Sequence, residues 1–272
     1  MSMDLSTFSD RSGQLSLDGI DFDAFRDNPL DADALRCLRY MHDVESHTIC
    51  YLRDLLLTPS HLDPRITTFL TLWNFEEHWH GEALGRVLAA HGEASGAERI
   101  GPMRGQLGRW DRVKPLVSAL GSSIVGDDFV ATHMSWGAVN EWSTHSGYGR
   151  LVERANHPVL TELLTRIMRQ ESRHVAFYAS EAKARLSTST RAQRVTRWAL
   201  RRFWSPVGSG VMPEEETRFL FDYLLSGADG SAAVARLDNS VDKLPGLAGL
   251  HLLRTAAARY GTNGLTSGSR AA

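Results

Sequence analysis

Apolar residues recur at every third or fourth position along most of the chain, and almost no segment alternates strictly between apolar and polar residues. This spacing predicts helices rather than strands, because one face of an α-helix collects residues three and four positions apart. We therefore expect an all-α protein. Its four longest helices are predicted over residues 31–57, 64–90, 127–155 and 158–186, with shorter ones over 113–120, 190–204, 214–225 and 245–259.

The four long helices are expected to form two hairpins. An Asp-Pro pair at residues 63–64 supplies an N-cap followed by a proline at the first helical position, which ends a short turn over residues 59–63. Asn-His-Pro at residues 156–158 separates the third helix from the fourth. Residues 92–112 contain several glycines and predict a long irregular crossover between the hairpins.

We expect one domain in three parts. Residues 1–27 are predicted to be a flexible N-terminal lead, and residues 28–186 a four-helix bundle with its crossover. Residues 187–272 are predicted to be additional C-terminal helices packed on the bundle, followed by a flexible tail.

Composition and charge exclude several classes of protein. A net charge of -2 argues against bulk binding to nucleic acid or to an anionic membrane surface. The chain has no apolar window of about 18 residues, so no membrane span is expected. Its polar start does not look like a signal peptide, and Cys37 and Cys50 lack the spacing of a zinc site or a disulfide framework. We therefore expect a cytoplasmic protein.

Polar residues interrupt the apolar faces of the long helices at corresponding places. Glu77 and His80 on the second helix are three residues apart, as are Glu171 and His174 on the fourth. This spacing places a carboxylate and an imidazole on the same helix face. One Glu-x-x-His match arises easily by chance, whereas two matches on core-facing stripes form a more specific signal.

Two further glutamates complete the pattern. Glu45 is as far from the turn at residues 59–63 as Glu77 is, and Glu141 is as far from residues 156–158 as Glu171 is. Residues equidistant from a hairpin turn meet at the same height, here roughly 23 Å from it. We therefore expect all the candidate ligands to meet in one layer.

Four carboxylates that face a core need compensation, because each unpaired buried charge costs several kcal/mol. Two divalent metal ions would supply it. A set of carboxylates and imidazoles suits iron or manganese better than metals that prefer thiolates. The same ligand pattern is known from di-iron carboxylate bundles.

Around these residues the sequence resembles the soluble acyl-[acyl-carrier-protein] desaturases of the ferritin-like superfamily. The resemblance covers about residues 35 to 182 and is carried by three motifs: WNFEEHWHG from Trp73 to Gly81, EWST from Glu141 to Thr144, and ESRH from Glu171 to His174.

The resemblance implies a ferritin-like bundle that holds two iron ions, with dioxygen as co-substrate. The implied iron ligands are Glu45, Glu77, His80, Glu141, Glu171 and His174, and Thr144 would lie beside the oxygen-binding face. The implied activity is O2-dependent desaturation of an acyl chain on an acyl carrier protein, part of fatty acid metabolism, with electrons from a ferredoxin-type donor. We also expect a homodimer.

Some residues depart from the family pattern. Gln170 replaces a residue that is usually acidic, which is expected to change the environment of His174 or the delivery of electrons, and His145 follows the threonine of the second motif. A di-iron hydroxylase or N-oxygenase of a free or tethered small molecule therefore remains an alternative, as does a non-catalytic ferritin-like metal-binding protein. Ile167 stands where related N-oxygenases carry an extra histidine, and Leu84 where ribonucleotide reductases carry a radical tyrosine.

The stretch from Ala182 to Pro213 contains basic residues and no Asp or Glu. It predicts either a solvated helix face or a docking surface for an acidic carrier protein or ferredoxin, since complementary charge speeds encounter. The residues proposed for carrier docking are Arg191, Arg194, Arg197 and Arg201. The segment from Trp204 to Gly210 predicts a fixed turn to which the sequence assigns no chemical role.

Overall fold

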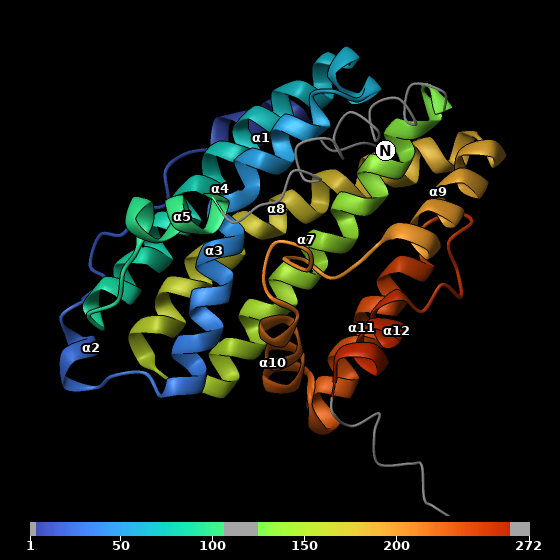
Figure 1. The fold of residues 1–272 in the computed structure, drawn as a ribbon. Helices are drawn as coiled ribbons and strands as arrows, with labels where there is room; N and C mark the ends of the chain where they lie inside the picture. The colour runs from blue at the N-terminus through green and yellow to red at the C-terminus, as the bar shows by residue number, and fades with distance from the viewer. Residues whose placement is uncertain (1–3, 106–124, 262–272) are drawn as a thin grey trace, which may run out of the picture.

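The computed structural model describes residues 4–105 and 125–261, and within these ranges the protein is all-α, as predicted. Four long helices dominate it (Figure 1): α3 (Ala32–Leu55), α4 (Pro64–Ala90), α7 (Asp128–Ala155) and α8 (Pro158–Thr188). α3 packs against α4 and α7 against α8, and contacts of α3 with α7 and of α4 with α8 join the two pairs. The predicted long helices are therefore confirmed, with ends within two residues of those expected.

Capping side chains set the starts of these helices. The Asp31 carboxylate accepts a hydrogen bond from the Ala34 N–H at 2.7 Å, and Asp63 caps α4 with Pro64 at its first position. A 3-10 helix, η1 (Pro59–Leu62), forms the turn before α4. Asn156 ends α7 in the left-handed conformation with φ of 45°, which turns the chain directly into α8.

The N-terminal segment packs against the long helices rather than forming the expected flexible lead. Residues 4–27 contain α1 (Leu5–Arg11) and α2 (Ala24–Asp27). Phe8 is fully buried, with its ring centroid 5.2 Å from that of Phe69 on α4. Leu15 and Phe25 are buried as well, so the segment adds apolar side chains to the core.

The crossover is more helical than predicted. Its first part forms α5 (Gly96–Gly105), although Pro102 lies inside that helix. Arg99 of α5 forms hydrogen bonds of 2.6 and 2.7 Å with the buried Asp43 carboxylate of α3, which fastens the crossover to the long helices. The short helix predicted over residues 113–120 lies outside the described residues.

The C-terminal third forms α9 (Thr190–Phe203), α10 (Glu214–Leu225), α11 (Gly227–Asp242) and α12 (Leu252–Tyr260). α9, α10 and α11 contact α7, and α10 also contacts α3. The prediction missed α11 because Gly, Ala, Ser and Asp supply much of its sequence. The predicted helix over 245–259 starts seven residues late, since Gly246 and Gly249 have positive φ values of 79° and 76°.

Two contacts between the long helices depend on glycine. A Cβ atom on Gly137 of α7 would lie 2.2 Å from the Tyr178 ring of α8, and one on Gly81 of α4 would lie 2.9 Å from Ser46 Oγ of α3. Absence of a side chain therefore sets how closely each pair of helices packs.

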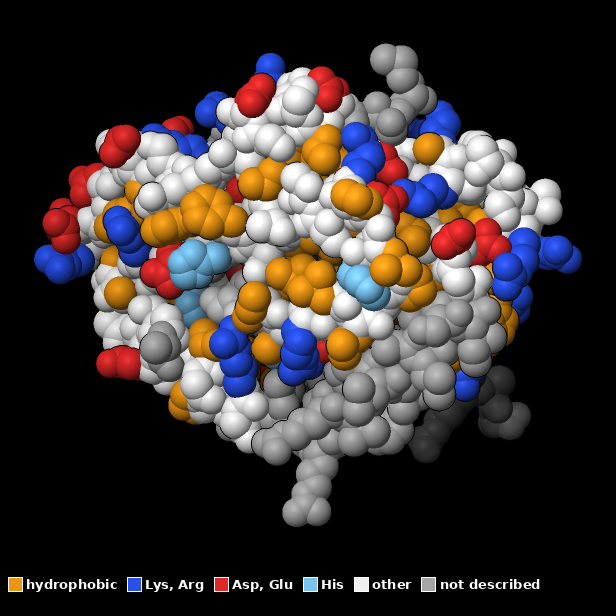
Figure 2. Space-filling model, turned by 90° about the horizontal axis from the view of Figure 1, so that it is seen from above, with side chains coloured by type: hydrophobic (Ala, Val, Ile, Leu, Met, Phe, Trp, Pro, Cys, Tyr) orange, Lys and Arg blue, Asp and Glu red, His pale blue; other side chains and the backbone are white. Residues whose placement is uncertain are grey.

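The outer surface is mixed in character. Seen from above (Figure 2), apolar side chains form several small groups separated by polar side chains and by charges of both signs. None of the described helices combines the length and the apolar character that crossing a bilayer requires.

Candidate metal centre

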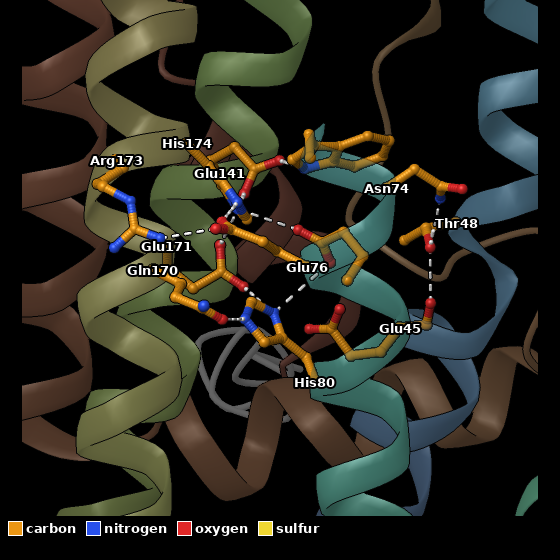
Figure 3. A network of polar contacts seen from close by, with 12 residues as sticks. Glu45, Thr48, Asn74, Glu76, His80, Glu141, Gln170, Glu171, Arg173 and His174 are labelled. Carbon is orange, nitrogen blue, oxygen red and sulfur yellow. Dashed lines mark hydrogen bonds and ion pairs between the residues drawn. The ribbon is translucent and has the colours of Figure 1, made fainter. Parts of the chain in front are cut away.

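The six predicted ligands lie together among the four long helices. Five of them, Glu45, His80, Glu141, Glu171 and His174, can be followed in Figure 3. They form two overlapping groups, and within each group one ligand atom per residue lies within 4.8 Å of the others. Glu77 and Glu171 belong to both groups. The first group is completed by Glu45 and His80, and the second by Glu141 and His174.

Each helix contributes to this layer as the register predicts. Glu45 comes from α3, Glu141 from α7, and the two Glu-x-x-His pairs from α4 and α8. All six side chains are buried, and His80, Glu171 and His174 are fully buried. Hairpin partners meet here because each pair is equidistant from its turn.

Both histidines direct Nδ1 toward the carboxylates. His80 Nδ1 lies 3.2 Å from Glu171 Oε1, and His174 Nδ1 lies 3.1 Å from Glu77 Oε1. Their Nε2 atoms point outward, so Nδ1 is the atom available to a metal ion.

The outward nitrogens have different partners. His80 Nε2 lies 2.9 Å from Gln170 Oε1, whereas His174 Nε2 lies 2.7 Å from Glu76 Oε2. Arg173 donates a 2.7 Å hydrogen bond to the other oxygen of Glu76. The expectation that Gln170 acts on His174 is therefore wrong, since Gln170 faces the histidine of the other helix.

The two outer carboxylates are also held in place. The Trp73 indole N–H donates to Glu141 Oε1 at 3.0 Å, and the buried Tyr148 hydroxyl donates to Glu45 Oε1. These contacts fix the orientation of both carboxylates.

Crowding shifts the pKa values of the carboxyl groups in opposite directions. Burial and the nearby carboxylates of Glu45 and Glu171 raise the pKa of Glu77 well above its ordinary value, and burial together with Glu171 and Glu77 does the same to Glu141. Burial also opposes ionisation of Glu171, yet interactions with the imidazoles of His174 and His80 hold its pKa well below its ordinary value.

The histidines are shifted toward the charged form. Burial would lower the pKa of His174, but hydrogen bonds to Glu171 and Glu76 raise it to about 10. The pKa of His80 is raised against the effect of burial by Glu171. Protons thus compensate the buried carboxylates in part, as metal cations would do more fully.

Three atoms of the layer test whether a metal pair fits. Among the described residues, Glu77 Oε1, His80 Nδ1 and Glu171 Oε1 are buried without a hydrogen-bond partner. Buried polar atoms of this kind are costly unless something binds them. All three atoms face the centre of the layer, and their oxygen and nitrogen chemistry suits iron or manganese. The residues therefore fit a pair of metal ions.

A cavity of about 510 Å³ reaches one side of the layer. Its wall includes Glu45, Glu77, Glu141 and Thr144, together with the segment from Ser205 to Val211. A smaller cavity of about 90 Å³ shares Glu45 and Thr144 with it, and most of its remaining wall is apolar, including Met41, Leu220, Phe221 and Leu224. Thr144 thus lies where the two cavities meet the carboxylates.

The segment from Trp204 to Gly210 also gains a role. The Tyr40 hydroxyl donates to the Val207 carbonyl at 2.8 Å, and the Trp204 indole N–H donates to Asn140 Oδ1 at 3.1 Å. Gly208, with φ of 83°, packs where a Cβ would lie 2.5 Å from the Tyr40 hydroxyl. These contacts fix the segment as a wall of both cavities.

Other candidate residues lie outside the layer. His145 Nε2 is 3.2 Å from Ser172 Oγ, and His133 Nδ1 is 2.7 Å from Ser60 Oγ, so neither joins the ligand groups. Burial lowers the pKa of His133 to about 3, which keeps it neutral. Leu84 and Ile167 are fully buried in one apolar cluster, which leaves those positions without metal-binding or radical-forming groups.

Sequence reasoning missed the outer partners of the ligands. Glu76 stands next to Glu77 in the first motif, and its position one residue earlier turns it toward His174 instead of the centre. The double glutamate was the available signal. Tyr148 follows Glu141 by seven residues on α7, and its bond to Glu45 depends on how α3 and α7 pack.

A scan against protein-family models found no match, and searches of curated proteins and of solved structures found none either.

Proposed function

We propose that this protein is a ferritin-like, non-haem di-iron oxidoreductase that uses dioxygen to oxidise an unactivated C–H bond, as an acyl-carrier-protein-linked acyl desaturase does. The observation that carries the proposal is the pair of overlapping ligand groups that share Glu77 and Glu171 beside a cavity. Shared carboxylates between two histidine-bearing positions suit two metal ions rather than one.

The proposed residues divide the work. Glu45 and His80 would hold one iron ion, Glu141 and His174 the other, and Glu77 and Glu171 would bridge them. Two ferrous ions bound there would activate dioxygen, which is the oxidant that C–H cleavage requires. Thr144 presents its side chain to the cavity one turn after Glu141, where its hydroxyl can hold or move a proton beside the reacting atoms.

The cavities support an elongated substrate with an apolar part. The larger cavity has polar residues such as Asn140 and Thr48 in its wall, whereas the smaller one is mainly apolar. An alkyl chain that extends past Thr144 into the smaller cavity would lie directly against Glu45 and thus beside the proposed irons. Apolar walls also exclude water from the reacting carbon.

Of the four arginines expected to dock a carrier protein, two make contacts within the protein and two are exposed. Arg191 pairs with Asp128 at 3.1 Å, and Arg197 donates to the carbonyls of Gly246 and Ala248, so both have structural contacts. Arg194 and Arg201 are exposed on α9.

A third cavity, of about 520 Å³, extends this basic region. Arg197, Arg201 and Arg259 line it, and it shares Ser205 and Pro206 with the cavity beside the metal ligands. A basic hollow next to the proposed substrate cavity favours an acidic carrier protein as the substrate donor. A ferredoxin-type electron donor, also acidic, is part of the same proposal.

The deciding experiment begins with protein loaded with ferrous iron, reduced without oxygen and then exposed to it. Acyl-carrier thioesters, free acids and free amines are supplied separately, and products are identified by mass spectrometry. Loss of two hydrogen atoms from a carrier-bound acyl chain supports the desaturase. Gain of one oxygen atom by any substrate indicates the hydroxylase or N-oxygenase alternative, and iron binding without oxygen consumption indicates a non-catalytic metal protein.

A further inference from the structure

The N-terminal strap, which we define as residues 4–13, lies behind the two ligand histidines. Its helix α1 contacts α4. The fully buried ring of Phe8 lies 6.2 Å from the ring of His174 and also packs beside Phe177. The strap therefore covers the side of the metal layer from which the Nε2 atoms point outward.

One residue of the strap contacts both outer partners of these histidines. The Gly13 N–H donates to Glu76 Oε1 at 3.2 Å, and the Gly13 carbonyl accepts from the Gln170 amide nitrogen at 3.0 Å. The hydroxyl of Ser12 adds a 2.9 Å hydrogen bond to the same oxygen of Glu76. A single peptide segment is thus connected to His174 through Glu76 and to His80 through Gln170.

The bond from Gln170 to Gly13 determines how the glutamine amide is oriented. A backbone carbonyl can only accept, so Gln170 must turn its NH2 group toward Gly13 and its oxygen toward His80. That oxygen can only accept, so the hydrogen of His80 must be on Nε2. Nδ1 then keeps its lone pair for a metal ion.

Glu76 fixes His174 in another way. A carboxylate offers only acceptors, so His174 Nε2 carries the hydrogen. Donors from Ser12, Gly13 and Arg173 all reach Oε1 of Glu76, which leaves Oε2 for the histidine. The two histidines therefore differ. His174 has a carboxylate partner, whereas His80 has a neutral amide, whose oxygen and nitrogen could exchange places if Gly13 did not hold the nitrogen.

We infer that the N-terminal strap is a positioning element of the metal centre, in which Gly13 acts through Gln170 and Glu76 to keep Nδ1 of His80 and His174 directed at the metal ions. This inference rests on the proposed metal pair, and it does not depend on the oxygen chemistry or the substrate.

Two variants in the full-length chain test it. Ser12→Ala with Gly13→Pro removes both strap donors to Glu76, and Ser12 already has the extended backbone, with ψ of 136°, that precedes proline favourably. Gly13→Ala is the matched control, because its Cβ meets nothing within 4 Å and its N–H remains. Gln170→Leu is the second variant, since it breaks the connection between Gly13 and His80 and leaves Glu76 intact.

The measurements are Co²⁺ titration of the metal-free protein and ¹⁵N NMR of the histidines in the Zn²⁺-loaded protein. We expect the control to match wild type, the double variant to bind Co²⁺ about 10-fold to 100-fold more weakly, and Gln170→Leu to weaken one of the two ions. NMR should show Nδ1 of His80 losing its metal-bound signature in Gln170→Leu. Unchanged affinities and unchanged histidine signals in both variants would overturn the inference, whereas a wild-type protein that binds no Co²⁺ would instead overturn the proposed metal pair.

Discussion

His80 Nδ1 is closer to Glu171 Oε1 on the facing helix, at 3.2 Å, than to Glu77 Oε2 one turn away on its own helix, at 3.9 Å. His174 shows the same preference, with 3.1 Å to Glu77 and 3.3 Å to Glu171. Each of these glutamates therefore lies between two histidines, in the place of a bridging ligand. The remaining glutamates, Glu45 and Glu141, each belong to one ligand group only.

This difference predicts two classes of ligand variant. Glu77→Ala or Glu171→Ala should reduce bound iron below one ion per chain, because each removes a ligand from both positions. Glu45→Ala or Glu141→Ala should leave about one ion, because each affects a single position. Metal analysis of the purified, iron-loaded variants measures the outcome.

Glu82→Ala is the control for these variants, since Glu82 is exposed on the same helix as Glu77. It should retain the iron content of the wild type. Equal iron loss in all four ligand variants would contradict the bridging arrangement, and a single zinc ion in the wild type would contradict the di-iron proposal.

Metal affinity should rise with pH. In the metal-free protein the pKa of His174 is raised to about 10, so at neutral pH a proton must leave this histidine before a metal ion binds. The raised pKa values of Glu77 and Glu141 act in the same direction, because a carboxyl group that holds its proton more tightly is a poorer metal ligand at low pH. Co²⁺ titrations between about pH 6 and about pH 9 should show steadily tighter binding. A pH-independent affinity would show that protons do not compete for the site.

Thr144→Val should separate oxygen use from substrate oxidation. The substitution keeps the size of the side chain but removes the hydroxyl from the cavity wall beside Glu141. We expect several-fold less product per dioxygen consumed at unchanged iron content. Thr144→Ser keeps the hydroxyl and should retain most of the coupling. A Val variant coupled as well as wild type would limit Thr144 to helix packing.

Gly147→Leu should change substrate length preference. Gly147 lines the small apolar cavity, and a Cβ there would make an ordinary contact of 3.5 Å with Met41. The rest of a leucine side chain would occupy the cavity of about 90 Å³. Turnover of substrates with long apolar arms should fall several-fold more than turnover of short ones. Gly149→Ala, outside this cavity, serves as control, and equal effects on all lengths would contradict the assignment.

Arg194→Glu with Arg201→Glu should slow turnover of a carrier-bound substrate several-fold without changing iron content. Both side chains are exposed on α9, and reversing their charge repels an acidic partner. Added salt should reduce wild-type turnover in the same way, because it screens the attraction. Arg236→Glu is the control, because it reverses an exposed charge on α11 instead of α9 and should leave turnover unchanged. Full activity of the double variant, or wild-type activity without any carrier, would argue for a free substrate.

Local signals were sufficient to predict the long helices and the grouping of the candidate ligands in one layer. Helix starts can be predicted from sequence where the capping residue contacts only its near neighbours. Asp31 and the Asp63-Pro64 pair are of this kind. The ligand layer follows from helical spacing and the distance to each turn. By contrast, Leu244, Leu247 and Leu250 have helical spacing but lie in a glycine-containing turn region, where each is buried.

Contacts between distant segments could not be predicted in this way. The hydrogen bond from Gly13 to Glu76 spans 63 residues, and that from Gln170 to Gly13 spans 157. Nothing in the composition of residues 4–27 indicates these partners, because their positions depend on how α4 and α8 are already packed. The same reason explains why Gln170 was assigned to the wrong histidine.

The close contact between Gly137 and Tyr178 makes the candidate metal layer depend on the spacing of α7 and α8, and neither residue is a candidate ligand. Because a methyl group on Gly137 would overlap the Tyr178 ring, α7 and α8 can approach as they do only while position 137 lacks a side chain. Glu141 lies on α7 and Glu171 on α8, so the distance between these two carboxylates depends on Gly137, which is not itself a candidate ligand. A related chain that kept all six candidate ligands but had a larger residue at position 137 would hold α7 and α8 farther apart. Its carboxylates at positions 141 and 171 would then be too far apart to share one site.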